Sequence, residues 1–97
     1  MAAINNRIPF RCNLILQLIE HRDGLTPEQL YEILQPAFGT ERQCTVEGID
    51  EQMTSIKSVG LVEITETLEG DNNQLISIYR ITDYGLERSK KYLRKYV

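Results

Sequence analysis

The sequence predicts a mostly helical α+β fold, in the order helix, helix, helix, strand, strand, helix. Three segments in the first two thirds of the chain carry apolar residues spaced three and four apart, which is typical of helices that bury one face. Two alternating segments then flank a polar turn, and this pattern indicates a β-hairpin. With 97 residues, of which 41% are hydrophobic, the chain is expected to form a single domain over residues 1–97.

The first two helices are predicted before residue 36. Residues 9–20 form the first helix, whose apolar stripe consists of Phe10, Leu14, Ile15, Leu18 and Ile19. The second helix is predicted to begin with Thr26 as N-cap, followed by Pro27, with Gln29 placed to complete a capping box. Pro36 is expected to end this helix soon afterwards, because proline lacks the amide that an inner helical turn needs.

The third helix is predicted over residues 45–59. Four apolar residues of helical spacing are expected to face the core, namely Val46, Ile49, Met53 and Ile56. Gly60 is expected to end the helix in the left-handed conformation that glycine tolerates best. A ten-residue connection over residues 35–44 separates this helix from the second one.

A hairpin is predicted over residues 61–81 and a last helix over residues 83–96. The first strand has a period-two pattern in which Val62, Ile64 and Leu68 are the apolar members. The second strand answers with Leu75, Ile76, Ile78, Tyr79 and Ile81. Between the strands, residues 70–73 are a cluster of glycine, aspartate and asparagine, which favours a tight turn.

This order of elements resembles a known superfamily. A helix followed by SVGLVEI, a hairpin and then YRITDYGLERSKKYL is similar to the winged helix-turn-helix superfamily, and most of all to small regulators of the PadR-like and MarR-like kind. The resemblance implies that the third helix enters the major groove of double-stranded DNA and that the wing tip contacts its backbone. The chain is then a DNA-binding transcriptional regulator. The candidate DNA contacts are Thr54, Ser55, Lys57, Ser58, Asn72, Asn73, Arg88 and Lys91.

One feature departs from the superfamily pattern. Helix-turn-helix units join their helices by about 3 to 4 residues, whereas residues 35–44 intervene here. This segment is expected to be either a loop held down by Phe38 or an insertion that changes how the third helix is displayed.

Charge favours a different function for the same surface. Residues 41–71 contain eight acidic residues against only Arg42 and Lys57, although the whole chain is formally only −3. Phosphate attraction supplies most DNA affinity, so an acidic third helix and wing oppose duplex binding. The alternative is a protein-protein interaction module that docks a basic partner. Its candidate contact residues are Glu47, Glu51, Glu69 and Asp71.

The last helix is the basic part of the chain. Five of the last eleven residues are lysine or arginine and only Glu87 is acidic. Three explanations stay open: a solvated basic back, phosphate contact together with Arg7 and Arg11, and self-association. The resemblance implies a homodimer built by this helix, with Tyr92, Leu93 and Tyr96 as dimerisation candidates.

Several function classes find no support in the sequence. The single histidine, His21, lies near no nucleophile motif, so no enzyme activity is predicted. Cys12 and Cys44 lack zinc spacing and are expected to be free thiols, with no metal and no cofactor. No apolar run is long enough for a membrane span and no signal peptide is evident, so a cytoplasmic protein is expected. Residues 1–8 are expected to be either a disordered arm or a segment that lays Ile4 and Ile8 on the domain.

Overall fold

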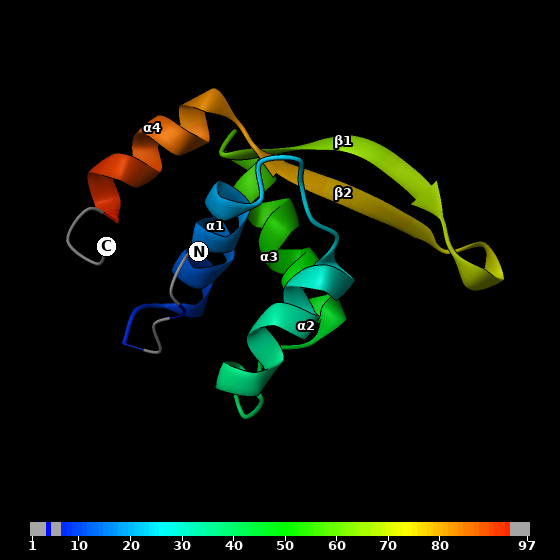
Figure 1. Ribbon diagram of the computed structural model, residues 1–97. Helices are drawn as coiled ribbons and strands as arrows, with labels where there is room; N and C mark the ends of the chain where they lie inside the picture. Colours follow the sequence, from blue (N-terminus) through cyan, green and yellow to red (C-terminus); the bar gives the residue numbers. More distant parts are fainter. Residues whose placement is uncertain (1–3, 5–6, 94–97) are drawn as a thin grey trace.

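The computed structural model describes residue 4 and residues 7–93, and it has the expected order of elements (Figure 1). These elements are α1 (Phe10–Glu20), α2 (Pro27–Phe38), α3 (Val46–Ser58), β1 (Val62–Glu69), a 3-10 turn η1 (Asp71–Asn73), β2 (Leu75–Ile81) and α4 (Asp83–Tyr92). The prediction of an α+β fold is therefore confirmed, and its layout is that of a winged helix. Figure 1 shows a body of α1, α2 and α3, with the hairpin, here called the wing, and α4 extending away from it in opposite directions.

The core lies among the three body helices. Its fully buried apolar side chains come from all three, namely Leu14, Leu18, Leu30, Leu34, Ile49, Met53 and Ile56. The predicted start of α2 is confirmed: the Gln29 amide donates to Thr26 Oγ1 over 3.1 Å, and the Thr26 amide donates to Gln29 Oε1 over 2.9 Å. Thr45 caps α3 in a similar way by accepting from the Gly48 amide at 2.9 Å.

The end of α2 differs from the prediction. Pro36 does not stop the helix, which continues to Phe38. Proline removes one hydrogen bond near the helix end, where few turns remain to be disturbed. The Phe38 ring packs edge-on against Phe10 with 5.3 Å between the centroids, and this contact favours the extra helical residues. The connection to α3 is consequently shorter than predicted, and Phe38 anchors it from the helix rather than from a loop.

The third helix is confirmed, with one correction to its buried face. Ile49, Met53 and Ile56 are buried, but Val46 is 37% exposed because it occupies the first helical position and borders an open groove. Gly60 has the predicted left-handed conformation with φ of 83°. The amides of Gly60 and Leu61 donate to the carbonyls of Lys57 and Ile56, which satisfies the helix end.

The wing pairs antiparallel as predicted, but one bulge changes which residues share a face. The register shifts between Ile64 and Glu66, so that Ile64 lies opposite Tyr79 while Leu68 lies opposite Ile76. Side chains alternate along a strand, and Tyr79 and Ile76 therefore point to opposite faces of the hairpin. The alternation expected along the first strand is broken by the bulge, and Ile64 and Leu68 remain 38% and 41% exposed.

Hydrogen bonds connect the base of the wing to the body. Leu25, in the loop between α1 and α2, exchanges backbone hydrogen bonds of 2.9 Å with Tyr79 in both directions. The Thr82 hydroxyl donates to the Gly60 carbonyl at 2.7 Å and accepts from the Gly85 amide, which caps α4. The base of the wing is thus held on both sides, and its outer part projects from the body.

The two ends of the chain differ in part from the prediction. Helix α4 ends at Tyr92, with Leu93 as its C-cap, and not at residue 96 as predicted; residues 94–97 lie outside the described residues. At the other end, Ile8 is buried in the core, whereas Ile4 is 36% exposed. The expectation that residues 1–8 lie on the domain therefore holds for Ile8, and residues 1–3 and 5–6 are outside the described part.

Candidate functional site

A groove opens between the wing and the N-terminal ends of α2 and α3. It has a volume of about 330 Å³ and is called the acidic groove below. It is lined by Pro27, Glu28, Val46, Glu47, Asp50, Gln74, Leu75, Ile76, Ser77 and Tyr79. Leu75 is 75% exposed, and partly exposed Val46 lies in the same lining. The groove thus combines apolar surface with carboxylates.

Three carboxylates line the acidic groove, and each is supplied by the start of a helix. Glu28 lies in the first turn of α2 and Glu47 in the first turn of α3, with Asp50 on the following turn. The N-terminal end of a helix dipole favours negative charge, so both first turns are places where an acidic side chain stabilises its helix. Among the residues that the structure describes, no lysine or arginine lines this groove.

Tyr79 fixes the floor of the groove. Its side chain is 3% exposed and its hydroxyl donates to Asp50 Oδ1 over 3.0 Å, which joins β2 to α3. Burial raises the pKa of the Tyr79 hydroxyl, and the Asp50 carboxylate reinforces the shift. The phenol is therefore a neutral donor at physiological pH and serves to position Asp50.

The wing adds further negative charge. Glu69 and Asp71, two of the predicted partner contacts, are exposed beside the tip, where Asn72 and Asn73 adopt positive φ angles of 61° and 60°. On the wing strands the only base is Arg80, and its guanidinium is already paired with Glu63 at 2.9 Å. The tip therefore presents carboxylates and amides without a cationic group.

The exposed face of α3 is less acidic than its sequence suggests. Arg11, on α1, donates from Nε to Gln52 Oε1 at 2.7 Å and from Nη2 to Ser55 Oγ at 3.3 Å. A guanidinium thus lies on the C-terminal half of α3, beside the predicted DNA contact Ser55 and on the helix that carries exposed Lys57. The predicted partner contacts Glu47 and Glu51 are exposed on the N-terminal half.

Two other predicted DNA contacts on α3 use their hydroxyl protons within the helix. Thr54 Oγ1 donates to the Asp50 carbonyl at 2.9 Å, and Ser58 Oγ donates to the Ser55 carbonyl at 2.6 Å. Both side chains are exposed, and both oxygens keep free acceptor capacity. A phosphate oxygen accepts hydrogen bonds, so each hydroxyl must break its hydrogen bond to the backbone carbonyl before it can donate to a phosphate.

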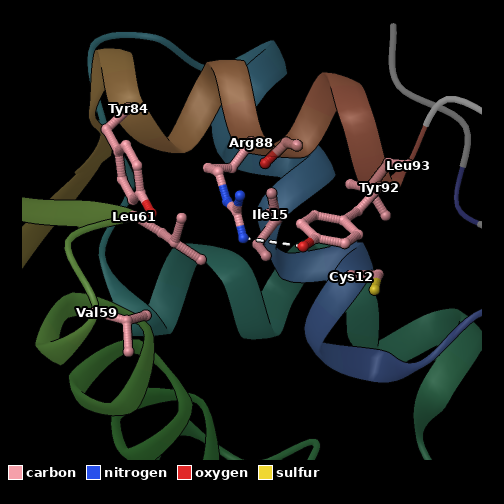
Figure 2. Close-up of a pocket in the computed structure, with 9 residues that line it drawn as sticks. Cys12, Ile15, Val59, Leu61, Tyr84, Arg88, Tyr92 and Leu93 are labelled. Atoms are coloured by element: carbon pink, nitrogen blue, oxygen red, sulfur yellow. Dashed lines mark hydrogen bonds between the residues drawn. The ribbon is translucent and has the colours of Figure 1, made fainter.

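A second hollow lies on the other side of the molecule, between α4, α1 and the segment after α3, and is called the α4 cleft. Its volume is about 190 Å³ and its lining consists of Cys12, Ile15, Val59, Leu61, Tyr84, Arg88, Ser89, Tyr92 and Leu93. Figure 2 shows Arg88 between the rings of Tyr84 and Tyr92. Its guanidinium carbon lies 5.9 Å and 4.9 Å from the two ring centroids, and Nη2 donates to the Tyr92 hydroxyl at 2.9 Å.

The predicted DNA contacts and dimerisation residues on α4 therefore do not form one exposed surface. Lys91 is exposed on α4 as predicted, whereas Arg88 is engaged by the two tyrosines. Of the dimerisation candidates, Tyr92 is 60% exposed, Leu93 is 4% exposed and packs into the core of its own chain, and Tyr96 lies outside the described residues. In Figure 1, α4 and the wing tip lie on opposite sides of the body, so Arg88 and Lys91 do not share a surface with Asn72 and Asn73.

The described residues contain no group of three or more histidine, cysteine, aspartate or glutamate side chains placed to hold a metal ion. Cys12 and Cys44 are free thiols, as predicted. Burial raises the pKa of both, opposed by Arg11 at Cys12 and reinforced by Glu41 at Cys44, so neither is a reactive thiolate at neutral pH. Within the described part of the chain, every helix is too short or too polar to cross a membrane.

No protein-family model, curated protein sequence or solved structure matches this chain. The residues of the acidic groove, the wing and the α4 cleft are therefore the basis for inferring what the chain binds.

Sequence reasoning found part of this surface and missed the rest. Glu47, Glu51, Glu69 and Asp71 are exposed where the third helix and wing were predicted. Glu28 and Arg11 were not connected with that surface, because they come from α2 and α1 and reach it only through tertiary packing. The signal for Glu28 was present in the capping box, which places residue 28 in the first helical turn.

Proposed function

We propose that this chain is a winged-helix protein-protein interaction module whose acidic groove docks a basic segment of a partner protein. The observation that carries the proposal is the lining of the groove, which combines the carboxylates of Glu28, Glu47 and Asp50 with the apolar side chains of Val46 and Leu75. Carboxylates at the rim attract a basic partner and select against acidic ones. Exposed apolar side chains gain free energy when a partner removes them from water.

The same surface is unfavourable for a DNA duplex. Nucleic-acid affinity comes mainly from lysine and arginine on phosphates, and neither the acidic groove nor the wing tip offers an unpaired base. Glu69 and Asp71 repel phosphate where a wing would approach the backbone. The charge distribution therefore supports the interaction module over a regulator that binds DNA.

The proposal is tested by fluorescence anisotropy with two labelled probes, at about 50 and 200 mM salt, the range in which phosphate contacts show themselves. One probe is a short peptide of alternating lysine and valine, and the other is a random-sequence duplex. We expect the peptide to bind, more weakly at the higher salt, and the duplex not to bind. Glu28→Lys with Glu47→Lys should abolish peptide binding.

A matched control separates the groove from the overall charge. Glu32→Lys with Glu87→Lys changes the net charge by the same amount at exposed positions outside the groove lining. This pair should retain peptide binding. Equal losses in both double variants would reduce the interaction to nonspecific charge attraction, and absence of peptide binding to the unaltered protein would overturn the proposal.

The second candidate function is duplex binding by the other half of α3, and it is favoured by one observation. Arg11 brings a guanidinium to Gln52 and Ser55, on the face where the superfamily resemblance expects base contacts. If this face binds DNA, Arg11→Ala should weaken duplex binding and reduce its salt dependence. Arg22→Ala, which removes an exposed arginine outside this face, is the control. A duplex that binds to neither the unaltered protein nor its Glu28→Lys, Glu47→Lys variant would remove this candidate.

A further inference from the structure

We infer that the occupant of the acidic groove is an extended segment that adds to the open edge of β2 as a further β-strand. This inference rests on the proposed function and specifies how the partner is held. It follows from the direction of backbone groups along β2, from a contrast between the two edges of the wing, and from the charge of the groove.

The hydrogen bonds at both ends of the wing fix which backbone groups point outward. The Gly70 amide donates to the Gln74 carbonyl at 2.7 Å, and the Thr82 amide donates to the Leu61 carbonyl at 3.0 Å, so residues 74 and 82 direct their groups toward β1. Tyr79 instead directs its amide and carbonyl to Leu25. Backbone groups alternate along an antiparallel strand, so Ser77 and Leu75 direct theirs to the same outer edge as Tyr79.

This outer edge already accepts a strand for one residue. Leu25 pairs with Tyr79, but the chain then enters α2 at Pro27 and leaves the sheet. Within the described residues, Ser77 and Leu75 make no backbone hydrogen bond outside the wing strands. Both line the acidic groove, so the unpaired part of the edge opens directly into it. A partner strand would continue the ladder that Leu25 begins.

The two edges of the wing differ in the features that prevent strand addition. Strand β1 carries Glu63, Glu66 and Glu69 and contains the bulge, and both charges and bulges discourage pairing at an edge. Residues 74–79 of β2 contain no charged residue and no proline. Of the two edges of the wing, only the β2 edge, on the groove side, is uncharged and has free backbone groups.

The groove also determines the chemistry of the added strand. A strand presents every second side chain to one face, and Leu75 shares a face of β2 with Tyr79, which reaches Asp50. A lysine on that face of an added strand can lay its methylene stem on Leu75 and Val46 while its ammonium group meets the carboxylates of the groove. Main-chain hydrogen bonds supply affinity in this mode, and the side chains of alternate residues supply selectivity. The partner is thus a basic, alternating, extended segment of another protein.

The decisive variant is Ser77→Pro, with Thr67→Pro as its control. Ser77 and Thr67 lie opposite each other in the wing, and both direct their amides away from the hairpin, one to each edge. Proline at such a position removes an outward donor without breaking the ladder between β1 and β2. We expect Ser77→Pro to weaken binding of the lysine-valine peptide about tenfold or more, as one hydrogen bond and the access of the strand are lost. Thr67→Pro should bind the peptide as the unaltered protein does.

A second measurement needs no substitution and decides the matter if Ser77→Pro fails to fold. Amide hydrogen exchange of Leu75 and Ser77 in the unaltered protein should slow when the peptide is added, while exchange of Thr67 and Glu69 stays unchanged. Peptide binding without protection at Leu75 and Ser77 would overturn strand addition.

The outcomes distinguish the two proposals. Loss of binding in the Glu28→Lys, Glu47→Lys variant, together with full binding by Ser77→Pro and no protection of Leu75 and Ser77 in the unaltered protein, would leave the docking function standing and remove the strand. Absence of peptide binding to the unaltered protein would remove both.

Discussion

The acidic groove and the α4 cleft are two hollows on one small domain, and they are built in different ways. In the α4 cleft the one charged side chain, Arg88, is engaged by two aromatic rings and a hydroxyl of its own helix. In the acidic groove the carboxylates of Glu28 and Glu47 form no ion pair with any described residue, and Leu75 is 75% exposed. The first hollow satisfies its charge internally, whereas the second leaves charge and apolar surface for another molecule.

This difference shows why net charge along the sequence does not locate a binding surface. The basic C-terminal helix is the most cationic stretch of the chain, yet Arg88 helps to close the α4 cleft. Of the acidic stretch, by contrast, Glu47 and Asp50 line the groove, and folding adds Glu28 of α2 to the same lining. Helix α4 is held by the buried residues Gly85, Ser89 and Leu93, and the wing is held by hydrogen bonds of Tyr79 and Thr82 near its base, so substitutions on the two sides should have different consequences.

The largest expected effect is on the α4 side, at Gly85. A Cβ there would overlap the Leu61 carbonyl oxygen and would lie 2.8 Å from the Leu61 carbonyl carbon and 3.0 Å from Ile81 Cγ1. Gly85→Ala should lower the free energy of unfolding by about 3 kcal/mol, since backbone atoms cannot move aside as a flexible side chain can. Thermal unfolding followed by circular dichroism measures the change. Glu87→Ala, on the exposed part of the same helix, is the control and should change little.

The junction between the two sides, Gly60, should give the next largest effect by a different mechanism. Its φ is 83°, but the nearest atom to an added Cβ is Tyr84 Cδ2 at 3.8 Å, so conformation and not space is limiting. Gly60→Val should destabilise by about 2 kcal/mol, because a β-branched residue resists a positive φ. Gly60→Asn should cost less than half as much, measured by denaturant unfolding. Equal costs would mean that side-chain volume, and not backbone conformation, limits this position.

These two glycines also indicate how far sequence can go. Gly60 was predicted from local pattern alone, since a helix end with a left-handed residue is a local event. The same is true of the capping box at Thr26 and of the polar turn in the wing. The close approach at Gly85 depends on Leu61, which is distant in the chain, and only the folded structure shows it.

The predictions from sequence that proved wrong also failed because of contacts between residues that are distant in the chain. Pro36 was expected to stop α2, but the packing of Phe38 on Phe10 favours its continuation. The bulge after Ile64 was not predictable from period-two alternation, because it is a property of the strand pair. For the candidate site, the acidic character of the α3 and wing residues could be predicted, whereas the contributions of Glu28 and Arg11 required the tertiary arrangement.

The link that holds the floor of the acidic groove is expected to have an intermediate effect. Tyr79→Phe removes the hydrogen bond to Asp50 and should lower stability by about 1.5 kcal/mol, within the range for hydrogen bonds to charged groups. Burial raises the pKa of Tyr79 in the folded state above its ordinary value of 10.0. The stability from Tyr79 is then fully present below pH 10.0 and is lost as the pH rises through the folded-state pKa.

The pH dependence gives a sharper measurement than the stability change alone. Denaturant unfolding of the unaltered protein should show stability falling above pH 10.0, and Tyr79→Phe should show a smaller fall. Cys12 and Cys44 have raised pKa values and contribute with the same sign, so the difference between the two proteins is the quantity to compare. Tyr84→Phe, at a tyrosine that is 53% exposed, is the control. Parallel curves for Tyr79→Phe and the unaltered protein would show that the buried phenol does not contribute.

The smallest expected effect is at Arg88, and it bears on what the basic helix does. Arg88→Ala removes two contacts between the guanidinium and the tyrosine rings, each worth about 0.5 to 1 kcal/mol at exposed sites, so the loss of stability should stay near 1 kcal/mol. Arg88→Lys keeps the charge but loses the planar group that stacks on the rings, and should lose part of the same stability. Binding of the lysine-valine peptide should be unchanged in both, because α4 and the wing extend in opposite directions (Figure 1).

Duplex binding distinguishes the two roles that remain for this helix. If Arg88 serves the α4 cleft, Arg88→Ala with Lys91→Ala should leave duplex affinity as it is in the unaltered protein, at both salt concentrations. If the helix instead holds phosphates, the double variant should weaken binding to every sequence and flatten its salt dependence. That second result would mean that the tyrosines release Arg88 when DNA is present, and the contrast between an internally satisfied cleft and an open groove would then no longer hold.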